Sequence, residues 1–232
     1  MKKLSSIYTG LWILIASSVG ANTHSLKQDV QALLTWENSG IVALGMGAAG
    51  MVHRWDDNLV GQAENNPILK ATAGPSNIYG SSTFNLTTTL GLWLISKAAQ
   101  KPNLEAVSSD LLRALLWNQA LVFPIKLSAR RNRPDGSNQL SFPSGHTANA
   151  FAIAGVLHKH YGPRAGIPLY AWSVLVGGGR MKTNRHFLSD VVAGAAIGLA
   201  VGRSISQTEP QQISLLPVPL SKGLMLVLTF KK

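Results

Sequence analysis

The chain has 232 residues and no cysteine, and its 21 Lys and Arg residues against 10 Asp and Glu residues give a formal net charge of +11. Without cysteine, a disulfide framework, a thiolate nucleophile and a cysteine-based zinc site are excluded. Charged residues make up only 13% of the chain, against about 25% in ordinary soluble proteins. The surface is therefore either sparsely charged or partly in contact with lipid.

The first 21 residues have the pattern of a secretory signal peptide. Lys2 and Lys3 form a basic start, an apolar segment follows, and small residues precede a cleavage site before Asn22. We therefore predict a signal peptide at 1–21, and a soluble or membrane-associated periplasmic protein of the bacterial cell envelope. The alternative is an inner-membrane protein with a periplasm-facing site, whose uncharged N-terminal segment is retained although it is short for a complete span.

Apolar residues recur at helical spacing in six later segments, so we expect one all-α bundle over residues 22–206. The predicted helices are residues 29–37, 84–99, 110–127, 143–160, 165–179 and 187–203. We expect the fifth, which is uncharged, to be buried. In the last helix small residues recur at every fourth position, which favours close contact with a neighbouring backbone. These residues are Gly194, Gly198 and Gly202.

Three other segments have less regular patterns. An apolar run at 41–52 ends at His53, Asp56 and Asp57, which we interpret as a solvated helix end rather than a metal site. Turn-forming residues predict a loop with one short helix at 62–79. The turn signals Pro134, Asp135 and Gly136 lie within a predicted loop at 130–139.

The tail, residues 207–232, changes from helical to strand-like character. Apolar runs at 213–218 and 224–230 are separated by a turn, which predicts a β-hairpin. Pro217 and Pro219 remove backbone donors, so the first run is expected to be an edge strand.

Near the end of the chain, His186 and Asp190 are four residues apart, so one helix face brings them together. A carboxylate that accepts a hydrogen bond from one imidazole nitrogen leaves the other nitrogen unprotonated. That nitrogen is then available as a nucleophile or as a metal ligand.

Pro143, Ser144, Gly145 and His146 form a predicted helix start. Free backbone N–H groups and the helix dipole favour a phosphate there, and Gly145 lets the anion come close. His146 would lie in the first turn, where it could protonate a departing oxygen. Taken alone, the same residues would also fit an ordinary capped helix with a surface histidine.

The cations fall in two short clusters, at 126–133 and 180–185. Lys126 supplies a point charge, and Arg133 and Arg180 supply planar forks, for the equatorial oxygens of a phosphoryl group. The other cations fit a solvated basic loop, except Arg131, which fits either interpretation. Those assigned to the loop are Arg130, Lys182 and Arg185.

A basic chain can be drawn to nucleic acid, anionic lipid or phosphorylated substrates. Because the cations lie among His, Ser and Gly residues rather than in an exposed run, a compact anion pocket is favoured. The alternation of aromatic and basic residues that stacks nucleic-acid bases is absent from the sequence. We therefore expect a phosphorylated substrate and no nucleic acid.

The spacings Lys-x6-Arg-Pro, Pro-Ser-Gly-His and Arg-x5-His-x3-Asp, in this order, resemble the three signature motifs of the type 2 phosphatidic acid phosphatase and vanadium haloperoxidase superfamily. The resemblance covers about residues 126–202 and implies that the bundle has the acid phosphatase/haloperoxidase fold. One departure is Gly179, where the family usually has a serine. The missing hydroxyl is expected to remove a hydrogen bond worth roughly 1 kcal/mol rather than the mechanism.

The resemblance also implies a role for each matching residue. His186 would attack phosphorus and form a phosphohistidine, Asp190 would fix its tautomer, and His146 would protonate the leaving group and then activate water. The phosphoryl oxygens would be bound by Lys126, Arg133, Ser144, Gly145 and Arg180. Cationic side chains would replace a metal, so no cofactor is implied, although vanadate is an expected inhibitor.

Two alternatives stay open at this point. In a haloperoxidase, vanadate would be the cofactor and His186 its ligand; in a non-catalytic envelope protein, the same pocket would only bind an anion or lipid. The expected substrate is a lipid phosphate, such as phosphatidate, phosphatidylglycerol phosphate, a polyprenyl diphosphate or a lipid A phosphate. The apolar, small-residue-rich helices favour membrane contact.

Overall fold

A computed structural model describes residues 23–207, 212–220 and 223–231, and side-chain surroundings for residues 27–205. The predicted signal peptide lies outside these residues. The helices are α2 (Thr23–Leu33), α3 (Trp36–Val52), the 3-10 helix η2 (His53–Trp55), α4 (Asp56–Asn65), α5 (Pro67–Tyr79), α6 (Ser82–Ala98), α7 (Pro102–Ala129), α8 (Gly145–Tyr161), α9 (Pro163–Lys182) and α10 (Leu188–Gln207). The predicted all-α bundle is confirmed.

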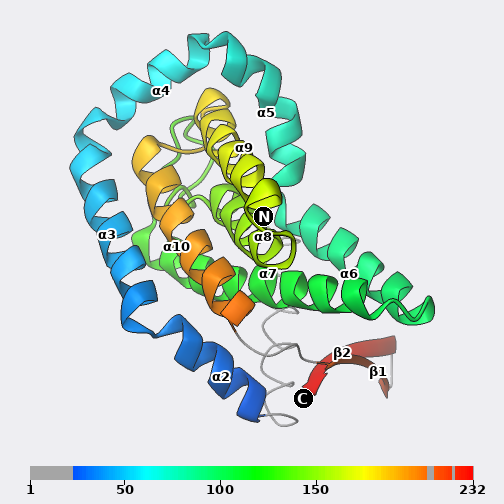
Figure 1. The fold of residues 1–232 in the computed structure, drawn as a ribbon. Coiled ribbons are helices and arrows are strands. Elements are labelled where there is room, and N and C mark those ends of the chain that lie inside the picture. Colours follow the sequence, from blue (N-terminus) through cyan, green and yellow to red (C-terminus); the bar gives the residue numbers. More distant parts are fainter. Residues whose placement is uncertain (1–22, 208–211, 221–222, 232) are drawn as a thin grey trace.

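The centre of the bundle is the pair α8 and α10. Helices α7 and α9 pack against α8, and α3 packs along α10. Figure 1 shows α3, α4 and α5 as an arc around α9 and α10, with α7 crossing behind them. The start of α8 is joined to the start of α10 by a hydrogen bond of 2.9 Å from the Ser144 amide to the Asp190 carbonyl. This end of the pair carries the motif residues.

The small residues of α10 lie against the backbone of α8, as the four-residue spacing predicts. Cβ atoms added at Gly194 and Gly198 would collide with the carbonyl oxygens of Ser144 and Ala148. A Cβ at Gly202 would lie 2.7 Å from the carbonyl oxygen of Ala152. Because each glycine meets the next turn of α8, the ridge fixes how far the two helices slide along each other.

The apolar core fills the space between α7, α8 and α10. Its fully buried members include Leu115, Val122, Val156, Val201 and Ile205. Val122 lies one helical turn before Lys126, so burial of this α7 face brings Lys126 to the start of α8. A second, smaller cluster joins Trp93 of α6 to Leu112 of α7.

Several predicted boundaries are wrong. Helix α2 ends at Leu33 and α3 begins at Trp36, because the Thr35 hydroxyl accepts a hydrogen bond from the Asn38 amide and caps a new helix. Helix α7 begins at Pro102, eight positions before the predicted start, with the proline in its first turn. Residues 62–79, predicted as a loop with one short helix, form the end of α4 and the whole of α5, with only Asn66 between the two helices.

Helix α9 is only partly buried, which corrects the prediction for 165–179. Gly177 and Arg180 face the interior, whereas Ile167 and Val174 are 64% and 62% exposed. An uncharged helix is therefore not evidence of burial in this chain. Its outer face adds to the apolar surface of the molecule.

The C-terminal hairpin forms as predicted, from β1 (Gln212–Leu220) and β2 (Gly223–Lys231). The strands are antiparallel, with Leu220 opposite Gly223 and Gln212 opposite Lys231. Figure 1 shows the hairpin at the lower end of the view, away from α4 and α5.

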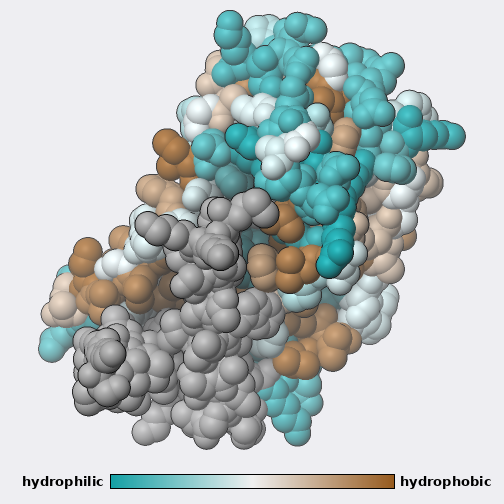
Figure 2. Space-filling view, turned by 180° about the vertical axis from the view of Figure 1, so that it is seen from behind, coloured by the Kyte–Doolittle hydropathy of each residue, from teal (hydrophilic) through white to brown (hydrophobic). Residues whose placement is uncertain are grey.

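The surface divides by polarity. Figure 2 shows hydrophilic residues over the upper part of one face and hydrophobic residues lower down. Among the described residues, one helical window, Leu188–Ile205, is long and apolar enough to cross a membrane, and 67% of it is buried within the bundle. Large apolar side chains are exposed on several other helices. Those more than 60% exposed are Leu34, Trp36, Leu44, Met51, Ile68, Ile95, Ile167 and Val174.

Candidate active site

The first turn of α8 forms the floor of the site. Ser144 caps the helix: its hydroxyl oxygen accepts hydrogen bonds from the Thr147 amide at 3.4 Å and from the Thr147 hydroxyl at 2.9 Å. Its own O–H is still available as a donor. A Cβ at Gly145 would lie 3.9 Å from Cε of Lys126, so the lysine stem passes next to this turn. Free backbone donors, a hydroxyl and a cation thus meet at one helix start.

His186 and Asp190 face each other across the start of α10. The distance between His186 Nδ1 and Asp190 Oδ2 is 3.7 Å, and both side chains are buried. Burial lowers the pKa of His186 to about 3, although Asp190 opposes this shift. His186 is therefore a neutral imidazole whose Nδ1 faces the carboxylate, which leaves Nε2 as the candidate nucleophilic atom.

Asp190 is held by donors on both of its oxygens. Oδ1 accepts from Arg131 at 2.7 Å, and Oδ2 accepts from the Ser141 hydroxyl at 2.5 Å and from the Phe187 amide at 2.8 Å. Burial alone would raise the pKa of Asp190, but its hydrogen bonds and the Arg131 charge outweigh burial and lower it. The carboxylate is thus ionised and fixed in orientation.

His146 lies within the electrostatic influence of Arg180, Arg133 and Lys126. Burial, followed by Arg180, His186, Arg133 and Lys126, lowers the pKa of His146 to about 3. On its other side, Gly80 comes so close that an added Cβ would lie 2.7 Å from His146 Cβ. The junction between α5 and α6 therefore holds the imidazole against the start of α8.

Lys126 reaches the site from the last turn of α7. Its Nζ donates to the carbonyl oxygens of Leu140 at 2.6 Å and Ser141 at 3.2 Å, which leaves a third N–H group. Burial, and then Arg133, lower the pKa of Lys126 to about 7, while Asp190 opposes the shift. An anion bound here would restore the lysine charge.

Arg133 and Arg180 both act electrostatically on Lys126 and His146. Burial, followed by Arg133 and then Arg185, lowers the pKa of Arg180 to about 10. Within the described part of the chain, the Nε–H groups of Arg133 and Arg180 are buried without a hydrogen-bond partner. Buried unpaired donors are unfavourable in free energy, and the oxygens of an anion would satisfy them.

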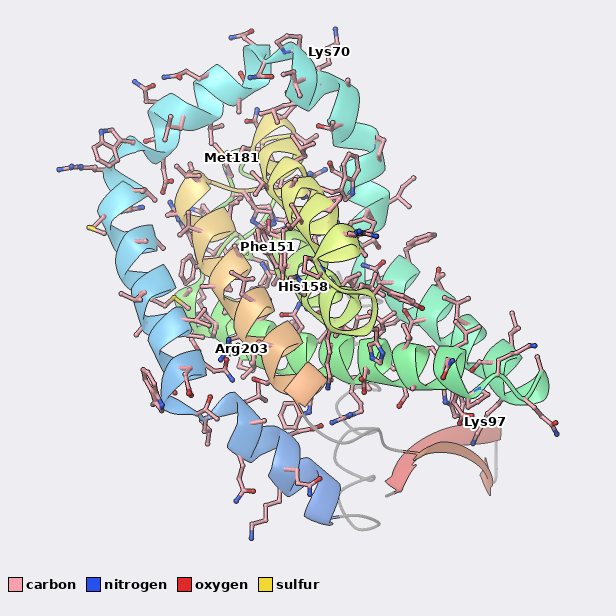
Figure 3. The ribbon with its side chains drawn as sticks, viewed as in Figure 1. Lys70, Lys97, Phe151, His158, Met181 and Arg203 are labelled. Carbon is pink, nitrogen blue, oxygen red and sulfur yellow. The ribbon has the colours of Figure 1, made fainter. Side chains whose placement is uncertain are left out.

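The eight predicted site residues thus gather at one end of α8. Figure 3 labels Met181, which follows Arg180 at this end of α9, and His158, which marks the direction of the opposite end of α8. Their catalytic and binding roles stay predictions. Of the cations assigned to a solvated loop, Lys182 donates to the Glu64 carbonyl, and Arg185 pairs with Asp135 at 3.0 Å.

Sequence reasoning missed four residues around the site. Asp56 is 3% exposed and accepts hydrogen bonds from Arg131 and Ser189, so its interpretation as part of a solvated helix end is wrong. Ser141 holds Asp190, and Asn77 of α5 accepts from Arg180 at 2.5 Å. The fourth is Ser189, which donates to Asp56. Its only signal in the sequence was its position next to Asp190.

In the described part of the chain, no group of three or more His, Asp or Glu side chains is arranged to hold a metal ion. The donors of the site are mainly cationic, which favours an anion over a metal.

Comparison with known proteins identifies relatives. A family model described as the PAP2 superfamily matches residues 108–213. A lipid A 1-phosphatase of Porphyromonas gingivalis is 46% identical over 80 residues, which are 33% of this chain and 18% of that protein. The match therefore spans less than a fifth of that relative.

Two solved structures share the fold. The transmembrane PAP2-type phosphatidylglycerolphosphate phosphatase of Bacillus subtilis has a TM-score of 0.61 and 22% identity, over 74% of this chain and 94% of that one. Aquifex aeolicus LpxE has a TM-score of 0.54 and 25% identity, over 66% of this chain and 95% of that one.

Proposed function

Because a PAP2 superfamily model matches residues 108–213, we propose that the chain belongs to this superfamily and is a phosphatase that hydrolyses phosphoric esters or diphosphates through a phosphohistidine, without a metal ion. The observation that carries this proposal is the buried, unpartnered donors of Arg133 and Arg180 around a neutral His186 with an ionised Asp190 behind it. This combination suits a bound anion facing a nucleophile.

In the first step, Nε2 of His186 attacks phosphorus while the bond from phosphorus to the ester oxygen breaks. Asp190 stabilises the positive charge that the imidazole acquires, because its carboxylate faces Nδ1. The departing oxygen takes a proton from His146. The products of this step are a free alcohol and phosphohistidine 186.

In the second step, His146 takes a proton from water and the water oxygen attacks phosphorus. The bond from phosphorus to Nε2 of His186 breaks, and inorganic phosphate leaves. Lys126, Arg133 and Arg180 neutralise the equatorial oxygens throughout, as metal ions do in other phosphoryl-transfer enzymes.

Substrate binding allows His146 to take up from solvent the proton that the first step requires. Without a bound anion, burial and the neighbouring cations hold the pKa of His146 at about 3, so its imidazole is neutral. A phosphate dianion among Lys126, Arg133 and Arg180 cancels much of their charge, which raises the pKa of His146. His146 is then protonated only when substrate is bound.

We further propose that the substrate is a lipid phosphate. Gly80 lies against His146, and on either side of this junction Ile78 and Phe84 are 55% and 46% exposed. An acyl chain leaving the phosphate site over α5 and α6 would cover these side chains. The printed names of two relatives, a lipid A 1-phosphatase and a phosphatidylglycerolphosphate phosphatase, point in the same direction.

The exposed apolar side chains of α3, α5, α6 and α9 support a membrane-associated protein of the cell envelope. We therefore propose three parts for the chain: a signal peptide at 1–21, a helical phosphatase domain at 22–206 and a hairpin tail at 207–232. Extraction of membranes without detergent tests the association, because a soluble periplasmic protein would be released by osmotic shock alone.

The activity test compares wild type with His186→Ala and His146→Ala, using dioctanoyl phosphatidate and p-nitrophenyl phosphate in buffer containing EDTA. We expect His186→Ala to lower phosphate release from both esters by at least about 10³-fold, because the nucleophile is lost. His146→Ala should affect phosphatidate far more, since nitrophenolate leaves without protonation.

Arg130→Gln is the matched control, because Arg130 is exposed and was assigned to the solvated loop. It should retain wild-type phosphate release. Wild-type turnover by His186→Ala, or release that requires an added divalent metal, would contradict the proposed mechanism. A preference for glycerol 3-phosphate over dioctanoyl phosphatidate would contradict the lipid substrate alone.

A further inference from the structure

Arg131 joins the buried carboxylates of Asp56 and Asp190, which are far apart in the sequence. Its Nη1 donates to Asp190 Oδ1 at 2.7 Å and to the Ser189 hydroxyl at 2.6 Å. Its Nη2 donates to Asp56 Oδ2 at 2.7 Å. The guanidinium also lies over the Phe187 ring, 4.3 Å from its centroid. Nη2 also lies 3.1 Å from His53 Nδ1, so the two outer nitrogens together contact η2, α4 and α10.

Asp56 holds the other side of this arrangement. It is the first residue of α4, and it accepts the Ser189 amide at 2.9 Å and the Ser189 hydroxyl at 2.5 Å as well as Arg131. One carboxylate thus anchors the guanidinium and the first turn of α10 together. Asp56 lies outside all three motifs, and α4 is 134 positions before Asp190 in the sequence.

We propose that Arg131 and Asp56 are positioning residues that keep the Asp190 carboxylate ionised and turned toward His186. This inference rests on the proposed function for its kinetic consequence. Asp190 Oδ1 is fixed by Arg131, so rotation of the carboxylate away from Nδ1 of His186 would break a charged hydrogen bond. Asp56 in turn fixes where the guanidinium stands.

The charges of the three groups explain why neither partner can be lost singly. Without Arg131, the buried carboxylates of Asp56 and Asp190 would have no cation between them. Burial and mutual repulsion would then disfavour the ionised state of both. Without Asp56, Arg131 would keep Asp190 but lose the contact that locates it. Arg131 should therefore matter more than Asp56.

The kinetic test uses Arg131→Gln, Arg131→Lys, Asp56→Asn and the double variant Arg131→Gln/Asp56→Asn, assayed with p-nitrophenyl phosphate. We expect Arg131→Gln to lower kcat about 10²-fold, the size of effect that misplacement of a catalytic group produces, with KM changed less than twofold. Lysine should restore part of kcat, because it keeps the charge but not the fork. The double variant should fall no further than Arg131→Gln.

If Arg131 had a purely structural role, its loss would lower the yield of folded protein but leave the kcat and KM of the folded fraction unchanged. Two further readouts separate the roles. In Arg131→Gln the acid limb of kcat/KM should move to higher pH, because loss of the cation raises the pKa of Asp190. In the ¹⁵N NMR spectrum of histidine-labelled protein, the Nδ1–H tautomer of His186 should dominate in wild type and be lost in Arg131→Gln.

The NMR measurement needs no turnover. If wild type releases no phosphate, the proposed function fails, and the tautomer of His186 still decides the positioning role. A wild-type tautomer and wild-type kcat in folded Arg131→Gln would overturn the inference, as would a KM effect with unchanged kcat. Arg130→Gln, one position away and exposed, controls for loss of an arginine in this loop.

Discussion

Gly179 lies where helices α5 and α9 touch. A Cβ added there would be 2.9 Å from both Cβ and Oγ of Ser76 and 3.4 Å from Cα of Ala73. The buried Ser76 hydroxyl thus stands where the side chain of a serine at 179 would be. The departure from the usual motif therefore accompanies a serine on the facing helix.

A swap of these two residues tests this explanation. Gly179→Ser should destabilise the protein by about 1–3 kcal/mol, because the added atoms overpack the contact. Ser76→Gly/Gly179→Ser should recover most of that loss, since the hydroxyl moves from one helix to the other. Urea unfolding of wild type, Gly179→Ser, Ser76→Gly and the double variant measures the coupling; additive effects would contradict it.

The pKa shifts of the two candidate active-site histidines predict how the stability of the folded protein depends on pH. Burial, the first cause of each shift, lowers the pKa values of His146 and His186 from 6.5 to about 3 in the folded protein. Between pH 6.5 and 3 the unfolded chain therefore binds protons that the folded chain does not. The contribution of these two neutral histidines to the free energy of unfolding is therefore fully present above about pH 6.5, and it is lost as the pH falls toward 3.

Replacing both histidines by glutamine should flatten this part of the stability curve, because the proton uptake on unfolding is removed. Urea titrations of wild type and the double variant at pH 7.0, 6.0 and 5.0 measure the difference. Parallel curves would show that the histidines are protonated equally in the folded and unfolded states.

At the scale of elements, the pairing of α8 with α10 depends on glycine. Gly198 has no room for a Cβ beside the Ala148 carbonyl, so Gly198→Ala should lower the free energy of unfolding by about 1–3 kcal/mol. Because the same helix pair carries Asp190 and Ser144, activity should fall as well. Thermal unfolding and phosphate release are measured on the same samples.

Gly47 supplies the comparison. It lies within α3 and an added Cβ would have no atom within 4 Å. Gly47→Ala should therefore be neutral or stabilise the helix by up to about 1 kcal/mol. Equal destabilisation by both alanines would contradict the packing account of the α10 ridge.

The elements that sequence patterns predicted best are those whose own residues determine them. Gly194, Gly198 and Gly202 give the helix contact by spacing alone, and the loop at 130–139 follows from its turn residues. Helix α5 was predicted only as a short helix within a loop, because Pro67 and Pro75 resemble loop signals. Pro67 occupies the first turn, where proline is tolerated, behind an Asn66 side chain that caps the helix.

The site shows the same division. His186 and Asp190 are four positions apart, so one helix brings them together whatever the rest of the chain does. Asp56 is brought to Asp190 only by the packing of α4 on the other helices, which no local pattern encodes. The sequence pattern placed Asp56 at a helix end, but it did not predict that the side chain is buried.

For the whole molecule, the formal charge of +11 is concentrated in part at one buried site. Burial, and then repulsion from Arg133, lowers the pKa of both Lys126 and Arg180 there. Repulsion among buried cations is unfavourable in free energy, and a bound anion would offset it. We therefore expect phosphate binding and folding stability to be coupled.

We expect inorganic phosphate and vanadate to raise the melting temperature, because they bind the folded chain alone. At a concentration 100 times Kd the gain is about 2.7 kcal/mol. Arg180→Gln should reduce this shift, since its buried Nε–H loses its anion partner, whereas EDTA should leave it unchanged. Thermal unfolding in sodium sulfate of equal ionic strength controls for salt. An equal shift in Arg180→Gln would show that the anions bind elsewhere, which would remove the physical reason for placing the phosphoryl group among these three cations.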